Sequence, residues 1–148
     1  MSKAEIAVKL FENYNCAQSV LSAYAADFNL DRAKALQVAA GFGAGMGRLQ
    51  ETCGAVTGAI MVLGLSSGFR EEDNREKSNA VYAKLRKLVD DFTREKGTIK
   101  CRELLGCDLS TEEGQAFFKE HNLRSNCREY ISICCRLLDS YLASRSEP

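Results

Sequence analysis

Apolar residues recur every three or four positions along almost the whole chain, and this spacing predicts helices. No stretch alternates convincingly with the period of two that is typical of a strand. The expected helices cover about 6–13, 17–28, 31–40, 53–65, 73–97 and 98–105, then one that opens at Ser110 or Thr111 and one from near Cys127 to Leu142. The pattern therefore predicts an all-α fold, a bundle of about six to eight helices in a single domain over residues 1–148.

A glycine-rich segment, residues 41–47, precedes the apolar helix that begins at Cys53. It lacks the Gly-Lys-Ser/Thr sequence of a phosphate-binding loop, and no strand precedes it, so we interpret it as a backbone elbow. Gly54 and Gly58 leave one face of the following helix almost without side chains, which lets another helix approach closely. We expect a buried central helix that the elbow positions.

Composition narrows the classes of function. The chain has 148 residues with 20 basic and 20 acidic side chains, so no overall field attracts nucleic acid. The N-terminus lacks the apolar core of a signal peptide, and the longest charge-free stretch, Thr52–Phe69, contains four glycines. This stretch favours a buried core helix over a membrane span. We expect a cytoplasmic protein with no membrane span and no nucleic-acid partner.

Seven cysteines and one histidine carry the candidate chemistry. An odd number of cysteines prevents complete internal disulfide pairing, and the single His121 removes sites that need two histidines. Cys16, Cys53 and Cys127 directly follow Asn or Thr residues that favour helix N-caps, and Cys101 lies three residues after Thr98. These four cysteines are therefore expected in the first turn of a helix. Free N–H groups and the helix dipole favour a thiolate there, and the thiolate is both the nucleophile and the metal ligand.

Cys53 is expected to be the most reactive of the four. Thr52 would cap the helix and Gly54 would leave its N–H groups open, so the dipole would lower the thiol pKa, against the opposing effect of burial.

The remaining three cysteines have other expected roles. Cys134 shares an apolar stripe with its neighbours and is expected in the core, and Cys135 points in a different direction on the same helix. Cys107 is either a resolving partner for Cys101 or a solvent-facing loop thiol.

The segment Cys53–Gly58 reads CGAVTG, and it resembles the CGAxxG hallmark of the C_GCAxxG_C_C family of redox-active proteins. The resemblance covers roughly residues 11–142 in order. It implies redox activity, genes near transporter loci, and a set of four characteristic cysteines: Cys16, Cys53, Cys101 and Cys127. Ala44 and Gln50 stand where family members often carry Gly. The family is also similar to split-Soret cytochromes, but this chain has no CxxCH for covalent haem attachment.

Three functions stay open. In the first, two or more of the four thiols cycle between thiol and disulfide with an unidentified redox partner, as in a thiol-dependent oxidoreductase. In the second, the four thiolates hold an iron–sulfur cluster or zinc, although no local CxxC supports a zinc ribbon or a thioredoxin motif. In the third, the chain is a helical binding module with structural cysteines. The small-residue face fits either an intrachain contact or a homodimer.

Overall fold

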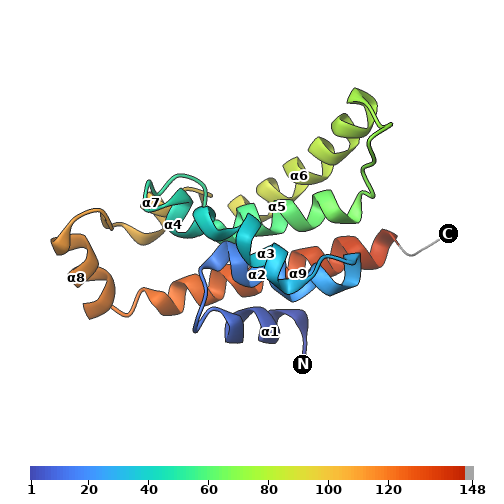
Figure 1. The fold of residues 1–148 in the computed structure, drawn as a ribbon. Helices are drawn as coiled ribbons and strands as arrows, with labels where there is room; N and C mark the ends of the chain where they lie inside the picture. The colour runs from blue at the N-terminus through green and yellow to red at the C-terminus, as the bar shows by residue number, and fades with distance from the viewer. Residues whose placement is uncertain (146–148) are drawn as a thin grey trace.

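The computed structural model describes residues 1–145. Within this range the chain forms nine α-helices, two 3-10 helices and no strand (Figure 1). In chain order they are α1 (Lys3–Leu10), α2 (Cys16–Tyr24), η1 (Ala25–Phe28), α3 (Arg32–Val38), η2 (Ala40–Phe42), α4 (Gly43–Met46), α5 (Gly54–Ser66), α6 (Arg75–Lys96), α7 (Cys101–Leu105), α8 (Glu112–Glu120) and α9 (Arg124–Arg145). The all-α prediction is confirmed. The number of helices exceeds the expected range because the elbow itself contains the short α4.

The core lies where α2, α5 and α9 pack against one another, with α1 covering α2 and α9. α2 and α5 approach closely through the small-residue face of α5. A Cβ added at Gly58 would lie 2.9 Å from the carbonyl oxygen of Ala17 and 3.0 Å from Val20 Cβ. From the sequence, this small-residue face could serve either an intrachain contact or a homodimer. In the structure α2 packs on it, so the contact is intrachain.

Several helix ends lie where the sequence signals placed them. The side chain of Asp31 caps α3, and Thr111 caps α8 through an oxygen that accepts a backbone N–H. Gly97 and Gly106 follow α6 and α7 with left-handed φ angles of 84° and 70°. Such angles carry no Cβ penalty in glycine, and they end a helix.

Two helix starts differ from the prediction. Thr52 does not cap α5; it pairs with Lys100 in an isolated antiparallel bridge, and Cys53 itself is the N-cap residue. α9 begins at Arg124, three residues before Cys127, because the chain turns at Asn122, which has a φ of 50°.

One end of the molecule is formed by α7 and α8 (Figure 1). Figure 1 shows α7 and α8 beyond the N-terminal ends of α2 and α5, while the N-terminal half of α6 projects at the opposite side. None of the helices formed by residues 1–145 combines the length and hydropathy needed to cross a bilayer.

Candidate functional site

One cavity of about 410 Å³ is lined by all four cysteines that the sequence singled out. Cys16 is the first residue of α2, and Cys53 is the N-cap of α5. Cys101 is the first residue of α7, and Cys127 is the fourth residue of α9. Three of them therefore lie at helix starts, as expected, whereas the N–H of Cys127 already bonds the carbonyl of Leu123.

Cys16 and the start of α5 are brought together by the absence of a side chain at Gly54. A Cβ at that position would lie 2.4 Å from Cys16 Sγ, so any larger residue would displace the sulfur. Asn15 holds the start of α2 through a reciprocal capping box with Gln18. The glycine of the CGAxxG motif thus makes room for the sulfur of another cysteine.

Cys53 and Cys101 are held by pairing between the segments that precede their helices. The N–H of Cys53 donates to the carbonyl of Ile99 at 2.7 Å, and the N–H of Cys101 donates to the carbonyl of Glu51 at 2.7 Å. These two bonds flank the bridge between Thr52 and Lys100. The segment before α5 and the segment before α7 therefore fix the two cysteines relative to each other.

The elbow between α3 and α5 has an unusual backbone. Six residues have positive φ: Ala44 (53°), Gly45 (64°), Met46 (70°), Gly47 (59°), Arg48 (68°) and Gln50 (57°). A left-handed conformation costs a non-glycine residue roughly 1–2 kcal/mol, so four of these positions are strained. The sequence indicated special dihedral angles at the glycines but gave no signal for the other four.

Ala44 and Gln50 are the two positions where the resemblance led us to expect Gly. Both have left-handed φ angles, 53° and 57°, which glycine adopts without strain. Two residues other than glycine therefore hold a backbone conformation that glycine adopts without strain.

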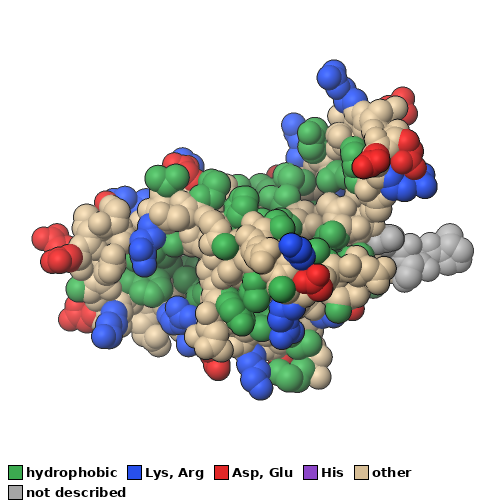
Figure 2. All heavy atoms as spheres, in the orientation of Figure 1, with side chains coloured by type: hydrophobic (Ala, Val, Ile, Leu, Met, Phe, Trp, Pro, Cys, Tyr) green, Lys and Arg blue, Asp and Glu red, His purple; other side chains and the backbone are tan. Residues whose placement is uncertain are grey.

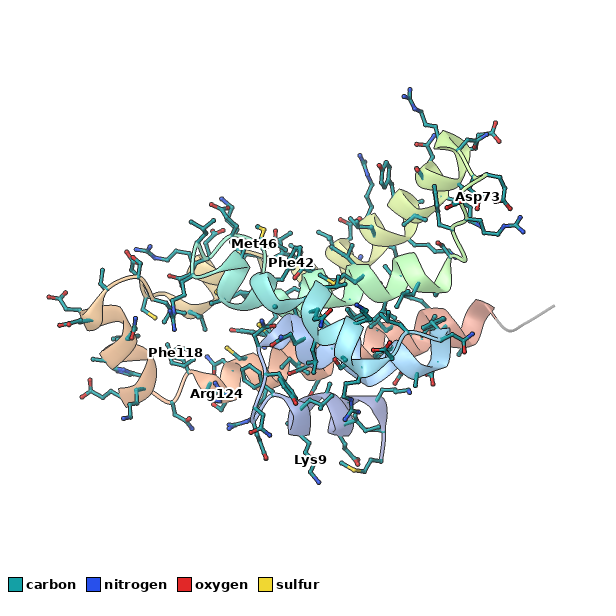
Figure 3. All side chains as sticks on the ribbon, viewed as in Figure 1. Lys9, Phe42, Met46, Asp73, Phe118 and Arg124 are labelled. Carbon is teal, nitrogen blue, oxygen red and sulfur yellow. The ribbon has the colours of Figure 1, made fainter. Side chains whose placement is uncertain are left out.

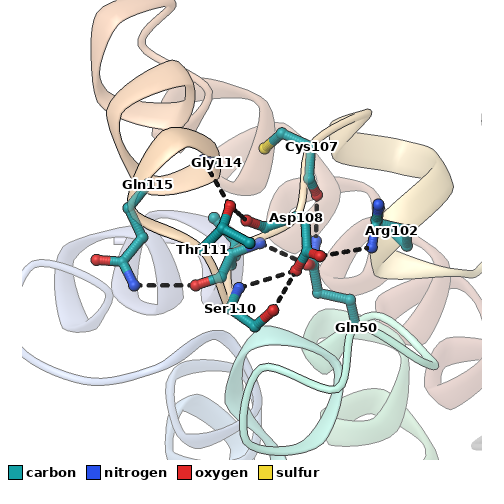
Figure 4. A network of polar contacts seen from close by, with 9 residues as sticks. Gln50, Arg102, Cys107, Asp108, Ser110, Thr111, Gly114 and Gln115 are labelled. Carbon is teal, nitrogen blue, oxygen red and sulfur yellow. Dashed lines mark hydrogen bonds and ion pairs between the residues drawn. The ribbon is translucent and has the colours of Figure 1, made fainter.

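The side chain of Gln50 makes two hydrogen bonds to the loop between α7 and α8. It is 3% exposed, its Nε2 donates to the carbonyl of Cys107 at 2.8 Å, and its Oε1 accepts the N–H of Leu109 at 2.7 Å (Figure 4). The elbow is thus tied to the loop between α7 and α8. Sequence reasoning missed this role, since a lone Gln in a glycine-rich segment carries no pattern.

The same loop is braced by Asp108. Its carboxylate pairs with Arg102 at 3.4 Å and accepts the Ser110 hydroxyl at 2.6 Å, while its carbonyl accepts the hydroxyl of Thr111 at 2.9 Å (Figure 4). Gly114 packs directly on this loop, because a Cβ there would lie 1.6 Å from the Asp108 carbonyl oxygen. These contacts fix α8, which supplies Phe118 to the cavity wall.

Burial controls the protonation of the cavity thiols. It raises the pKa of Cys101 to about 11 and the pKa of Cys127 to about 12, with negative charge on Cys16 as the next contribution. Burial also raises the pKa of Cys53, followed by charge on Cys16, against the backbone N–H groups of Ala55 and Val56. These cysteines are protonated at neutral pH. The expected lowering of the Cys53 pKa by the helix dipole is outweighed by burial, since the residue is only 6% exposed; that Cys53 is the most reactive thiol stays a prediction.

Cys16 differs from the other three in its surroundings. Burial raises its pKa, but backbone N–H groups act to lower it from three segments: α2 itself, the start of α5 at Gly54, and the elbow at Ala44. Cys16 is also partly exposed and influences the pKa values of the other three. A negative sulfur in this cavity is therefore best supported at Cys16.

The other three cysteines lie outside the cavity lining. Cys134 and Cys135 are 0% exposed, which confirms the core position predicted for Cys134. Cys107 is 8% exposed, so the solvent-facing alternative is wrong: Gln50 holds the Cys107 carbonyl and the loop folds inward.

An iron–sulfur or zinc site requires several ligand side chains close to one point. Among residues 1–145, no three Cys, His, Asp or Glu side chains are placed where they could hold a metal ion. The thiol donors suit zinc or iron–sulfur chemistry, but their arrangement here does not.

The rest of the cavity wall is aromatic, aliphatic and basic. It includes Phe11, Tyr14, Phe118 and Tyr130 together with Arg48 and Arg124, and no acidic residue. In Figure 3, Phe118 and Arg124 lie below and to the left of Met46 and Phe42 of the elbow. The space-filling view shows hydrophobic side chains in a hollow beside α8, with basic side chains next to it (Figure 2).

Comparison with known proteins gives one match. A family model described as "Putative redox-active protein (C_GCAxxG_C_C)" matches residues 14–141, a stretch that includes the four cavity cysteines. No curated protein and no solved structure matches the chain.

Proposed function

Because the chain belongs to the C_GCAxxG_C_C family of redox-active proteins, we propose that its cavity cysteines cycle between dithiol and disulfide. The observation that carries the proposal is the lining of a single cavity by four thiols from four separate helices. Cysteines that only filled the core would have no reason to meet at a cavity, and Cys134 and Cys135 show where such residues lie.

Cys16 is proposed as the attacking thiol and Cys53 as its resolving partner. The sulfur of Cys16 lies against Gly54, the residue next to Cys53, and charge on Cys16 is the largest electrostatic influence on the Cys53 pKa. Cys16 takes the attacking role because backbone N–H groups from three segments act to stabilise its thiolate.

The reaction balances as ordinary thiol–disulfide exchange. The Cys16 thiolate attacks one sulfur of a partner disulfide, forming a mixed disulfide and releasing one partner thiol. The Cys53 thiol then loses its proton and attacks the Cys16 sulfur, which releases the second partner thiol. Two protein thiols become one disulfide, and one partner disulfide becomes two thiols; the reverse sequence reduces the protein.

The elevated thiol pKa values fit slow thiol–disulfide exchange with few side reactions. The neutral thiols resist random oxidation, because the thiolate is the reactive form. Backbone N–H groups around Cys16 stabilise the small thiolate population from which exchange proceeds.

The test is oxidation of the anaerobically purified protein with a dithiol–disulfide buffer, followed by intact mass measurement and non-reducing peptide mapping. We expect loss of two hydrogens and a peptide that links Cys16 to Cys53. Cys16→Ser should abolish the link, whereas Cys107→Ser, outside the cavity lining, should retain it.

Metal analysis of the same anaerobic preparation tests the alternative. Stoichiometric zinc or iron that shields the four cavity thiols from alkylation would overturn the disulfide proposal in favour of a metal centre. Four thiols that stay reduced and metal-free would instead indicate a binding module with structural cysteines.

A further inference from the structure

The charge on the cavity wall points to the class of molecule that reacts there. The lining residues include two arginines and no Asp or Glu, although the whole chain has 20 acidic and 20 basic side chains. With the thiols protonated at neutral pH, nothing in the cavity wall balances these two positive charges.

Neither arginine is engaged with a carboxylate. Within residues 1–145, the ion pairs involve other basic residues, and Arg48 and Arg124 take part in none of them. Arg124 is fixed in place: it donates to the carbonyl of Phe11, and its guanidinium lies 4.1 Å from the centre of the Phe11 ring. Arg48 also lines the cavity, is exposed, and directly follows the elbow with a left-handed φ of 68°.

The size and chemistry of the cavity suit a small molecule. Its volume of about 410 Å³ lies within the range of small-molecule sites. Arginine binds carboxylates through paired N–H donors, and the aromatic and leucine side chains of the wall accommodate an aliphatic chain.

We propose that the cavity takes a low-molecular-weight disulfide or thiol that carries carboxylates, which Arg48 and Arg124 bind while its sulfur faces Cys16. This inference rests on the proposed function and names its substrate class. In the oxidising direction the anionic disulfide RS–SR becomes two RS–H, and Cys16 and Cys53 become one disulfide, so atoms and electrons balance as in the exchange above.

Three small disulfides of different charge test the proposal with the reduced protein. Dithiodipropionate carries two carboxylates, hydroxyethyl disulfide is neutral, and cystamine is cationic. Rates of protein disulfide formation are divided by the rates of each reagent with a free cysteine derivative, which removes differences in intrinsic reactivity. We expect dithiodipropionate to be favoured over hydroxyethyl disulfide about tenfold, and cystamine to be the slowest.

Arginine variants assign the preference to the cavity. Arg48→Gln should lower the ratio of dithiodipropionate to hydroxyethyl disulfide about threefold, because Arg124 remains, and it is an exposed side chain whose loss leaves the core intact. Arg86→Gln, an exposed arginine on α6, is the matched control and should keep the full ratio. Suberate, which replaces the two sulfurs of dithiodipropionate by methylenes, should inhibit the wild type more strongly than Arg48→Gln.

The possible results separate the two proposals. If no disulfide oxidises the reduced protein at Cys16, the proposed function fails. If all three disulfides react with equal normalised rates, or if Arg86→Gln lowers the ratio as much as Arg48→Gln does, thiol exchange stands and the anionic substrate class is wrong.

Discussion

The four cavity cysteines differ in how much of each residue is exposed to water. Cys53 and Cys101 are buried, whereas Cys16 and Cys127 are partly exposed. A helix dipole lowers a thiol pKa by about one unit at most, while full burial raises it by up to several units, so burial decides the outcome. The helix-start positions of Cys16, Cys53 and Cys101 were readable from the sequence, whereas that of Cys127 was misplaced. The burial of these cysteines was not readable, because it depends on segments that close over the helix ends from elsewhere in the chain.

Alkylation kinetics test the effect of burial at one residue. Cys101 has a pKa raised to about 11. Its rate of reaction with iodoacetamide should therefore rise about tenfold per pH unit from pH 7 to 10 without a plateau, since the thiolate fraction grows in that proportion. Isotope-labelled iodoacetamide with peptide mass spectrometry measures it. The same peptide in the unfolded protein should level off above about pH 8.5; a plateau below pH 9 in the folded protein would contradict the assignment.

Strain at Ala44 gives a second prediction. Its φ of 53° lies in the left-handed region, where Ala loses roughly 1–2 kcal/mol and Gly does not. Ala44→Gly should stabilise the protein by up to about 1 kcal/mol, after the larger entropy of unfolded glycine is subtracted. Ala83→Gly, at an exposed position of the right-handed helix α6, should destabilise it by about 1 kcal/mol. Urea unfolding would contradict the strain argument if both variants lost stability.

Single helices illustrate which signals are local. The caps at Asp31 and Thr111 and the glycine stops at Gly97 and Gly106 are short-range chemistry, and the sequence predicted them. The start of α5 was misplaced because Thr52 pairs with Lys100, a residue that lies far along the chain. The left-handed elbow was missed for the same reason: contacts with α7 and its loop hold non-glycine residues in a conformation that they do not prefer.

The two faces of α5 provide a matched pair of substitutions. A Cβ at Gly58 would meet the backbone of α2 at 2.9 Å, whereas a Cβ at Gly64 meets nothing within 4 Å. Gly58→Ala should cost about 1–3 kcal/mol from overpacking. Gly64→Ala should stabilise the same helix by about 0.5–1 kcal/mol, because alanine is the better helix former. Equal effects of the two substitutions in thermal or urea unfolding would show that α2 does not rest on this face.

The cavity is a property of the whole molecule. Its walls come from α2, the elbow, α5, α7, α8 and α9, segments that span most of the chain. The sequence predicted an all-α fold and the four cysteines of interest, because helical periodicity and capping are local. It could not predict the shape of the cavity or the presence of both Arg48 and Arg124 in its wall, since both depend on how distant helices pack.

Alkaline pH should weaken the whole fold under reducing conditions. Every cysteine has a pKa that burial raises above its unfolded value. Below about pH 8.5 folded and unfolded thiols are both protonated, so the stabilisation is fully present. As the pH rises, the unfolded chain releases protons that the folded chain keeps, so the free energy of unfolding falls by up to about 1.4 kcal/mol per pH unit for each buried thiol.

Cys134→Ala measures how much one fully buried thiol contributes to this fall in the free energy of unfolding. At pH 7 the variant should be less stable than the wild type by about 1 kcal/mol, from lost burial of the sulfur. The wild type then loses about 1.4 kcal/mol at pH 9.5 through ionisation of the unfolded Cys134, a loss that the variant does not share. The difference between the two proteins should therefore vanish at about pH 9.2 and reverse by about 0.4 kcal/mol at pH 9.5, as measured by urea unfolding in the presence of a reductant. Parallel stability curves from pH 7 to 9.5 would mean that Cys134 ionises as readily in the folded protein as in the unfolded chain, and the core position of this thiol would have to be abandoned.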